Sequence, residues 1–167
     1  SIRFLKDDGY LSAITSNAWL GKDYGIQFKK FLLDNFHIKY IVRSNAEHWF
    51  LDSKVSTIFM VLQKGKNDKA TKFITLNFKL TDQFDQTDIN NRLSQIENFY
   101  SEIDNCQDPR NPSWRIDTTF EDLYHNLDDT ITVALIPCKI LVDSINSKDN
   151  WSKYFISSHL FERFDNY

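Results

Sequence analysis

Glycine, proline and cysteine are scarce in this sequence of 167 residues, which contains four, three and two of them. This shortage, together with 41% hydrophobic residues, excludes a collagen-like repeat, a linker and a disordered chain. No apolar run reaches the roughly 20 residues that span a bilayer, and the first five residues lack the layout of a signal peptide. We therefore expect a folded cytoplasmic protein without membrane association.

Patterns typical of metal sites and of common nucleophiles are also missing. The two cysteines, Cys106 and Cys138, lie far apart and outside any C-x-x-C context, which favours reduced core thiols. The histidines at positions 37, 48, 125 and 159 lack the spacing or the cysteine partners that zinc needs. We expect no metal site, and no G-x-S-x-G nucleophile elbow is present.

Charge is distributed unevenly along the chain. Residues 1–80 carry 13 basic and 7 acidic residues, whereas residues 81–167 carry 7 basic and 16 acidic ones. The densest basic cluster consists of Lys64, Lys66, Lys69 and Lys72. These lysines are candidate contacts to DNA phosphates, and the alternative is a solvated hairpin tip.

The first half of the sequence has the pattern of a strand, a helix and a strand. Residues 2–8 are typical of a helix tail that stops at Gly9, and residues 10–15 of a short buried strand ending in a polar loop. Residues 24–36 carry one apolar stripe, which predicts an amphipathic helix, and residues 38–42 favour a second strand. A crossover of this kind makes the two strands parallel and predicts an α/β fold.

Two more strands follow. The apolar run 55–63 predicts a central strand buried on both faces. After the turn at residues 65–68, the alternation over residues 73–79 predicts an antiparallel partner of that strand with one solvated face.

Beyond residue 80 the sequence becomes acidic and rich in Asn and Gln. It predicts a helix over 89–103, a short helix with the capping box Thr118–Glu121, and a strand over 131–136. We divide the chain into residues 1–80, a linker or small α+β extension over 81–150, and a final segment over 151–167.

Residues 5–64 resemble the later motifs of adenine-specific DNA methyltransferases of restriction-modification systems, of type II or IIG. The resemblance rests on both the content and the order of the motifs. They are LKDDG at 5–9, ITSNAWL at 14–20, FLLDNF at 31–36, IKYIV at 38–42, Phe50, and VSTIFMVLQK at 55–64. In addition, Asn150–Phe155 is similar to a segment found in this family before the target-recognition domain.

This resemblance implies a partial doubly wound sheet of methyltransferase type that ends in an antiparallel hairpin, followed by the mixed α+β extension. It also implies a parent enzyme that transfers a methyl group from S-adenosylmethionine to adenine in double-stranded DNA. Residues 1–80 would then complete the catalytic domain, and residues 151–167 would lead into target recognition.

The family's cofactor and catalytic motifs do not occur before Gly9. The four glycines, at 9, 21, 25 and 65, form no G-x-G, and no N-P-P-[YFW] motif is present. Asn111-Pro112-Ser113-Trp114 differs from the latter at one position, but DPRNPS is typical of a turn. We therefore expect no catalytic residue in this chain, no bound cofactor and no methylation by the chain alone.

Several positions are candidates for the wall of the cofactor and target-base pocket. Enzymes that modify a base in duplex DNA flip it out and hold it by stacking. The resemblance places Ser16, Asn17 and Trp19 beside this pocket. The register of the hairpin places Leu62 where some family members have an aromatic residue that stacks on the flipped base. Phe50 and Trp49, in the preceding loop, are alternative wall residues. The alternative is that Trp19 and Leu62 belong to the core and that Phe50 and Trp49 are simply buried.

Two further expectations concern partners. A sheet that lacks its opening strands would expose an edge, which predicts self-association. The alternative to the methyltransferase reading is a non-catalytic module that binds DNA or a protein through the Lys64–Lys72 face.

Overall fold

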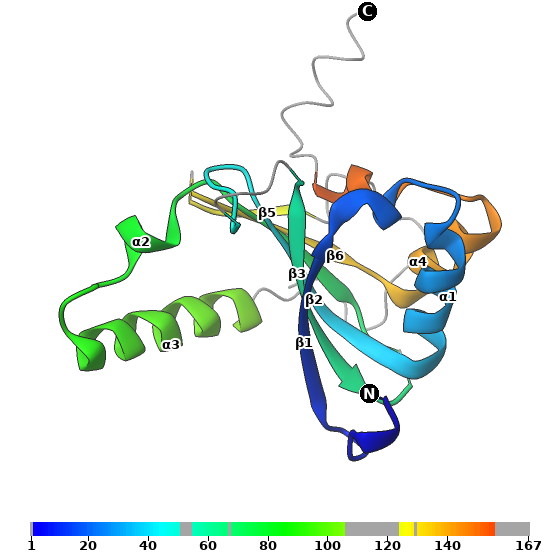
Figure 1. Ribbon diagram of the computed structural model, residues 1–167, viewed down its shortest axis with the longest axis horizontal. Helices are drawn as coiled ribbons and strands as arrows, with labels where there is room; N and C mark the ends of the chain where they lie inside the picture. Colours follow the sequence, from blue (N-terminus) through cyan, green and yellow to red (C-terminus); the bar gives the residue numbers. More distant parts are fainter. Residues whose placement is uncertain (1, 51–54, 67, 106–123, 129, 156–167) are drawn as a thin grey trace, which may run out of the picture.

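The computed structural model describes the chain except for residues 1, 51–54, 67, 106–123, 129 and 156–167. A six-stranded mixed sheet in the order β1-β3-β2-β4-β6-β5 forms its centre (Figure 1). The α/β fold class is confirmed. The candidate capping box at Thr118–Glu121, the tetrapeptide 111–114 and Cys106 lie outside the described residues.

The first three strands have the predicted arrangement. β1 (Tyr10–Ser16) and β2 (Phe36–Ser44) both pair antiparallel with β3 (Thr57–Lys64), which lies between them. β1 and β2 therefore run in the same direction, joined by α1 (Gly25–Asn35). The antiparallel hairpin of β2 and β3 is confirmed.

β3 differs from its prediction in burial. Ile58, Met60 and Leu62 are buried, whereas Phe59 and Val61 on the opposite face are only partly buried. The apolar run is typical of a strand covered on both faces, but the residues that the structure describes cover one face fully and the other in part.

The prediction for residues 73–79 was wrong in its partner and its exposure. β4 (Thr71–Leu76) pairs in parallel with β2 and antiparallel with β6 (Ile131–Ile136). Both edges of β3 are already hydrogen-bonded to β1 and β2, so the next strand pairs with the free edge of β2. Five of its six residues are buried, because both faces are covered: Phe73 packs in the larger core on one face, and Ile74 and Leu76 pack in the smaller core on the other.

The remaining strands extend the same sheet. β5 (Tyr124–Asp128) pairs antiparallel with β6 and forms one end of the sheet, and β1 forms the other. The predicted strand 131–136 and the predicted helix 89–103 are confirmed as β6 and α3 (Ile89–Asn105). The domain boundaries at residues 80 and 150 stay a prediction.

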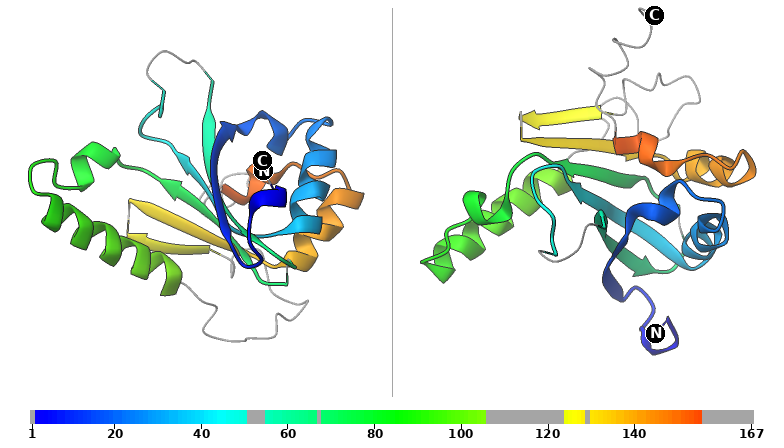
Figure 2. Two further views of the ribbon diagram at one scale, coloured as in Figure 1. Left: turned by 60° about the horizontal axis from the view of Figure 1, so that its bottom comes forward. Right: turned by 45° about the horizontal axis from the view of Figure 1, so that its top comes forward.

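Helices cover the two faces of the sheet unequally. α1, α4 (Cys138–Asn146) and the 3-10 helix η4 (Trp151–Phe155) cover one face (Figure 2). They enclose the larger core with Leu32, Ile41, Met60, Leu141 and Trp151. On the other face, the C-terminal end of α3 encloses a smaller core, and α2 (Leu80–Gln83) contributes no buried residue.

The N-terminal element is shorter than predicted. Residues 2–8 contain one 3-10 turn, η1 (Ile2–Phe4), and Asp8 rather than Gly9 has a positive φ of 60°. In the described part of the chain, no helix is both long enough and apolar enough to cross a bilayer.

Candidate functional site

The carboxyl ends of three strands lie at one edge of the sheet, where open α/β sheets bind ligands. β1, β2 and β4 run in the same direction, since β1 and β2 both oppose β3 and β4 is parallel to β2. The segments that follow them are the 3-10 helix η2 (Asn17–Leu20), the loop that begins at Asn45, and α2.

Backbone hydrogen bonds hold two of these segments to neighbouring parts of the sheet. The amide of Asn17 donates to the carbonyl of Ser56 at 3.0 Å, and the amide of Asn45 donates to that of Leu76 at 2.8 Å. The hydroxyl of Ser16 caps η2 by accepting from the Ala18 amide at 3.2 Å. The start of η2 and the start of the loop after β2 are therefore fixed in place at this edge.

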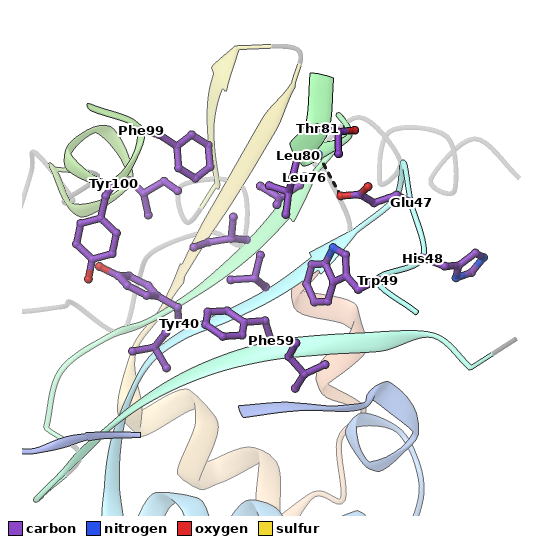
Figure 3. A pocket seen from close by; sticks show the side chains of 15 residues that line it. Tyr40, Glu47, His48, Trp49, Phe59, Leu76, Leu80, Thr81, Phe99 and Tyr100 are labelled. Carbon is purple, nitrogen blue, oxygen red and sulfur yellow. Dashed lines mark hydrogen bonds between the residues drawn. The ribbon is translucent and has the colours of Figure 1, made fainter. Parts of the chain in front are cut away.

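A cavity of about 690 Å³ extends from this edge across the less covered face of the sheet (Figure 3). This volume lies within the range of roughly 300–1,000 Å³ typical of ligand sites. Aromatic side chains from the sheet, the 44–50 loop and α3 form much of its wall: Tyr40, Trp49, Phe59, Phe99 and Tyr100.

Polar groups are few in this cavity. Glu47 lines it and accepts a hydrogen bond from the Leu80 amide at 3.1 Å, which ties the loop to α2. The indole N–H of Trp49 is buried and has no hydrogen-bond partner among the described residues. An occupant of this cavity would therefore be mainly apolar.

Beside the Tyr40 side of the cavity, polar side chains of the sheet bind Asp104 in the last turn of α3, and we call this cluster the polar clamp. The Tyr40 hydroxyl donates to Asp104 Oδ1 at 2.7 Å, and Lys39 and Lys72 approach the same oxygen at 3.4 and 3.7 Å. Lys72 Nζ also donates to the carbonyls of Ile103 and Asp104. Lysines at a helix C-terminus satisfy its free carbonyls and oppose its dipole.

This clamp predicts a dependence of stability on acid pH. The hydrogen bond from Tyr40 and the charges of Lys39 and Lys72 lower the pKa of Asp104 below its ordinary value. A carboxylate whose pKa is lowered by folding stabilises the fold fully at pH values above its unfolded-state pKa of about 3.9. This stabilisation is lost as the pH falls through the folded-state pKa. We expect Asp104→Asn to remove this acid-induced loss, as measured by urea unfolding from pH 6 to pH 2. An unchanged pH profile in the variant would contradict the clamp.

The structure places the predicted wall residues in two different environments. Ser16 and Asn17 lie at the carboxyl edge, and Phe50, 50% exposed, lies in the loop after β2. Trp19 is buried against Phe28 and Trp151, with its N–H donating to Thr15. Leu62 is 2% exposed and lies in the larger core, on the face opposite the cavity.

The four candidate lysines also differ in environment. Lys64 pairs with Asp7 at 2.9 Å and donates to the Leu5 carbonyl, and Lys72 belongs to the polar clamp. Lys66 and Lys69, in the connection between β3 and β4, are exposed. The structure thus leaves these two directed at solvent.

Most of the cavity wall was missed by sequence reasoning, which named only Trp49 of its aromatic residues. The available signal was the alternation of Tyr40 with Val42 and of Phe59 with Val61, which places each pair on one face of its strand. The contribution of Phe99 and Tyr100 had no such signal, because it depends on where α3 docks.

Comparisons with known proteins support the resemblance in the motifs. Residues 1–50 match the Eco57I restriction-modification methylase family. The type IIG restriction endonuclease BpuSI has a similar structure, with a TM-score of 0.59 and 14% identity over 90% of this chain and 14% of that one. The type I restriction-modification methyltransferase subunit from Streptococcus thermophilus gives a TM-score of 0.50 and 15% identity over 86% of this chain and 26% of that one.

No curated protein matches the chain. The resemblance to restriction-modification methylases is confirmed by the family match, and the α/β sheet of methyltransferase type by the two structures. The chain spans about a seventh and about a quarter of their lengths.

Proposed function

We propose that this chain, whose first 50 residues match the Eco57I methylase family, is a later portion of the catalytic domain of an adenine-N6 DNA methyltransferase in a bacterial restriction-modification system. The observation that carries the proposal is the β1-β3-β2 arrangement, in which an antiparallel strand lies between two parallel ones. The family motifs run through these three strands in the expected order. The parent protein would act in the cytoplasm on double-stranded DNA.

In this proposal the carboxyl edge forms part of the wall around the flipped adenine. Ser16 and Asn17 would contribute polar groups, and Phe50 would provide an aromatic face. Phe50 suits stacking better than Leu62, because it is half exposed in a loop at this edge whereas Leu62 is packed in the core. Stacking of one base on an aromatic side chain contributes about 1–3 kcal/mol.

Among the described residues, the glycines form no cradle for S-adenosylmethionine. An added Cβ would come within 3 Å of Lys6 at Gly9, of Asn150 at Gly21 and of Trp19 at Gly25. Each of these glycines therefore allows close packing inside the chain. Gly65 has a φ of 142° after β3. In this proposal the cofactor would bind residues elsewhere in the parent protein.

DNA contacts and self-association belong to the same proposal. Lys66 and Lys69 are the lysines of the basic cluster that suit phosphate contacts, since Lys64 and Lys72 bind within the chain. Among the described strands β1 pairs only with β3, so its outer edge would be the surface for the parent's remaining strands or for a second copy.

The proposal is tested in the full-length protein by methylation of DNA with labelled S-adenosylmethionine. We expect label on adenine N6, and we expect Phe50→Ala to lower kcat/KM about tenfold, since loss of one stacking contact costs about 1.4 kcal/mol or more. Phe50→Tyr should retain most activity, because the ring is kept.

The matched control is Phe31→Ala, which removes a similarly exposed ring from α1 on the opposite face of the sheet. We expect it to leave kcat/KM unchanged. Methylation without any label on adenine would overturn the assigned function. Equal activities of Phe50→Ala and the wild type would overturn only the role of Phe50.

A further inference from the structure

An exposed apolar stripe runs along α3. Ile89, Leu93, Ile96 and Tyr100 are 58, 51, 39 and 45% exposed, although their spacing places them on the same side of the helix as Ile103, which is buried. Only the C-terminal end of α3 lies against the sheet, and its N-terminal part projects from the molecule (Figure 1). A helical stripe of this width is normally buried against another element.

The stripe continues into the cavity beneath it. Tyr100 and Ile103 form one cavity wall, Phe59 and Val61 lie on its floor, and Ile14 of the edge strand closes its other side. Ile14 is 48% exposed, and Phe59 and Val61 are only partly buried in a strand whose sequence is typical of cover on both faces. We call this continuous surface, from Ile14 through Phe59 and Tyr100 to Ile89, the α3 groove.

A small molecule would fill the cavity but would not cover the groove. Ile89, Leu93 and Ile96 are not among the residues that line the cavity. They extend the apolar surface along α3, whose 17 residues measure about 25 Å at about 1.5 Å per residue. An occupant that covers both parts must therefore be elongated.

The charge around the groove indicates the sign of the partner. Residues 80–105 contain six acidic residues and one basic residue, Arg92. One of the acidic residues, Asp104, is already paired with Lys39 and Lys72 of the sheet. The guanidinium of Arg92 is occupied by the carbonyls of Asp85 and Gln86, at 2.6 and 2.8 Å. Hydrogen bonds from Thr87 and Asn91 lower the pKa of Asp85, so this carboxylate stays charged.

This negative potential disfavours two other occupants. DNA is a polyanion and would be repelled by the segment, as would a membrane with anionic lipids. A second copy would bring the same acidic helix, so pairing of α3 with α3 would place like charges together. A protein partner with positive charge fits best.

We propose that the α3 groove binds a basic amphipathic helix of a partner protein. Its aliphatic stripe would pack along Ile89, Leu93 and Ile96, one large side chain would enter the cavity, and flanking lysine or arginine residues would face the acidic residues of the 80–105 segment. A helix suits this position because its backbone hydrogen bonds are satisfied internally, and helices pack side by side at roughly 8–10 Å.

The test measures fluorescence anisotropy of labelled 17-residue peptides with the full chain. One peptide carries leucines on one helical stripe and lysines elsewhere, the second has the same composition in scrambled order, and the third has glutamates in place of lysines. We expect the first peptide to bind at least tenfold more tightly than the other two. We expect Ile96→Asp to weaken this binding at least tenfold.

Asn98→Asp is the matched control, because it adds the same charge on the exposed opposite side of α3. It should leave the affinity unchanged or slightly increase it, since added negative charge attracts a basic peptide. Leu93→Gln provides a second stripe variant without a charge change and should also weaken binding.

Three results would overturn the proposal. The first is equal affinity for the striped and scrambled peptides, and the second is equal affinity of Ile96→Asp and the wild type. The third is a dimer of the chain that dissociates on Ile96→Asp in the absence of peptide, which would assign the groove to a second copy.

Discussion

Replacing Trp151 with alanine is expected to lower the free energy of unfolding by about 3–5 kcal/mol, the range typical of large aromatic residues truncated in a core. Trp151 is fully buried, and its ring contacts those of Trp19 and Phe73 at centroid distances of 5.9 and 6.2 Å. Its indole N–H donates to the Ser144 hydroxyl at 2.6 Å, so the substitution also removes a buried hydrogen bond. The ammonium of Lys29 lies 5.3 Å from the ring centroid and loses this contact as well.

Urea unfolding followed by far-ultraviolet circular dichroism measures this loss. Val142→Ala, on the exposed side of α4, is the control and should change the unfolding free energy by no more than about 0.5 kcal/mol. A loss below about 1 kcal/mol for Trp151→Ala would contradict the central place of Trp151 in the core.

The elements that the sequence predicted well are those with a strong local pattern. The helix over 89–103 and the strand over 131–136 agree with α3 and β6 within two residues at each end. The strands at 10–15 and 38–42 also agree with β1 and β2 within two residues at each end. In each case the apolar spacing or the β-branched composition is a property of the segment itself.

Strand partners were harder to predict, because pairing depends on which sheet edges are free. The turn at Gly65 suggested a simple hairpin with the next strand, yet β3 has no free edge once β1 and β2 flank it. β4 therefore pairs with β2, and this outcome could be deduced only from the order of the whole sheet. β4 is buried rather than half solvated because both of its faces contribute to a core.

The candidate site was predictable in its location but not in its wall. The carboxyl edge follows from strand direction, so Ser16, Asn17 and Phe50 could be placed there from motifs. Trp19 and Leu62 have large apolar side chains of the kind that line pockets, but they face the larger core. Single-sequence patterns do not distinguish these two faces, because both are apolar.

A substitution at Gly25 tests how closely α1 packs on the segment that carries Asn17 and Trp19. In most helices Gly→Ala stabilises by roughly 0.5–1 kcal/mol, because glycine loses more backbone entropy on folding. Here we expect the opposite sign, because a Cβ at Gly25 would overlap the Trp19 carbonyl oxygen. Overpacking against backbone costs typically about 1–3 kcal/mol, and we expect a net loss of about 2 kcal/mol in thermal or urea unfolding.

Gly21→Ala provides the matched comparison four residues earlier. A Cβ there would meet the side-chain amide of Asn150 at 2.7 Å, and this flexible group can turn away where a backbone carbonyl cannot. We expect Gly21→Ala to cost less than about 1 kcal/mol, so the two variants should differ clearly although each adds one methyl group. If Gly25→Ala were as stable as the wild type, α1 and η2 could not be packed this closely.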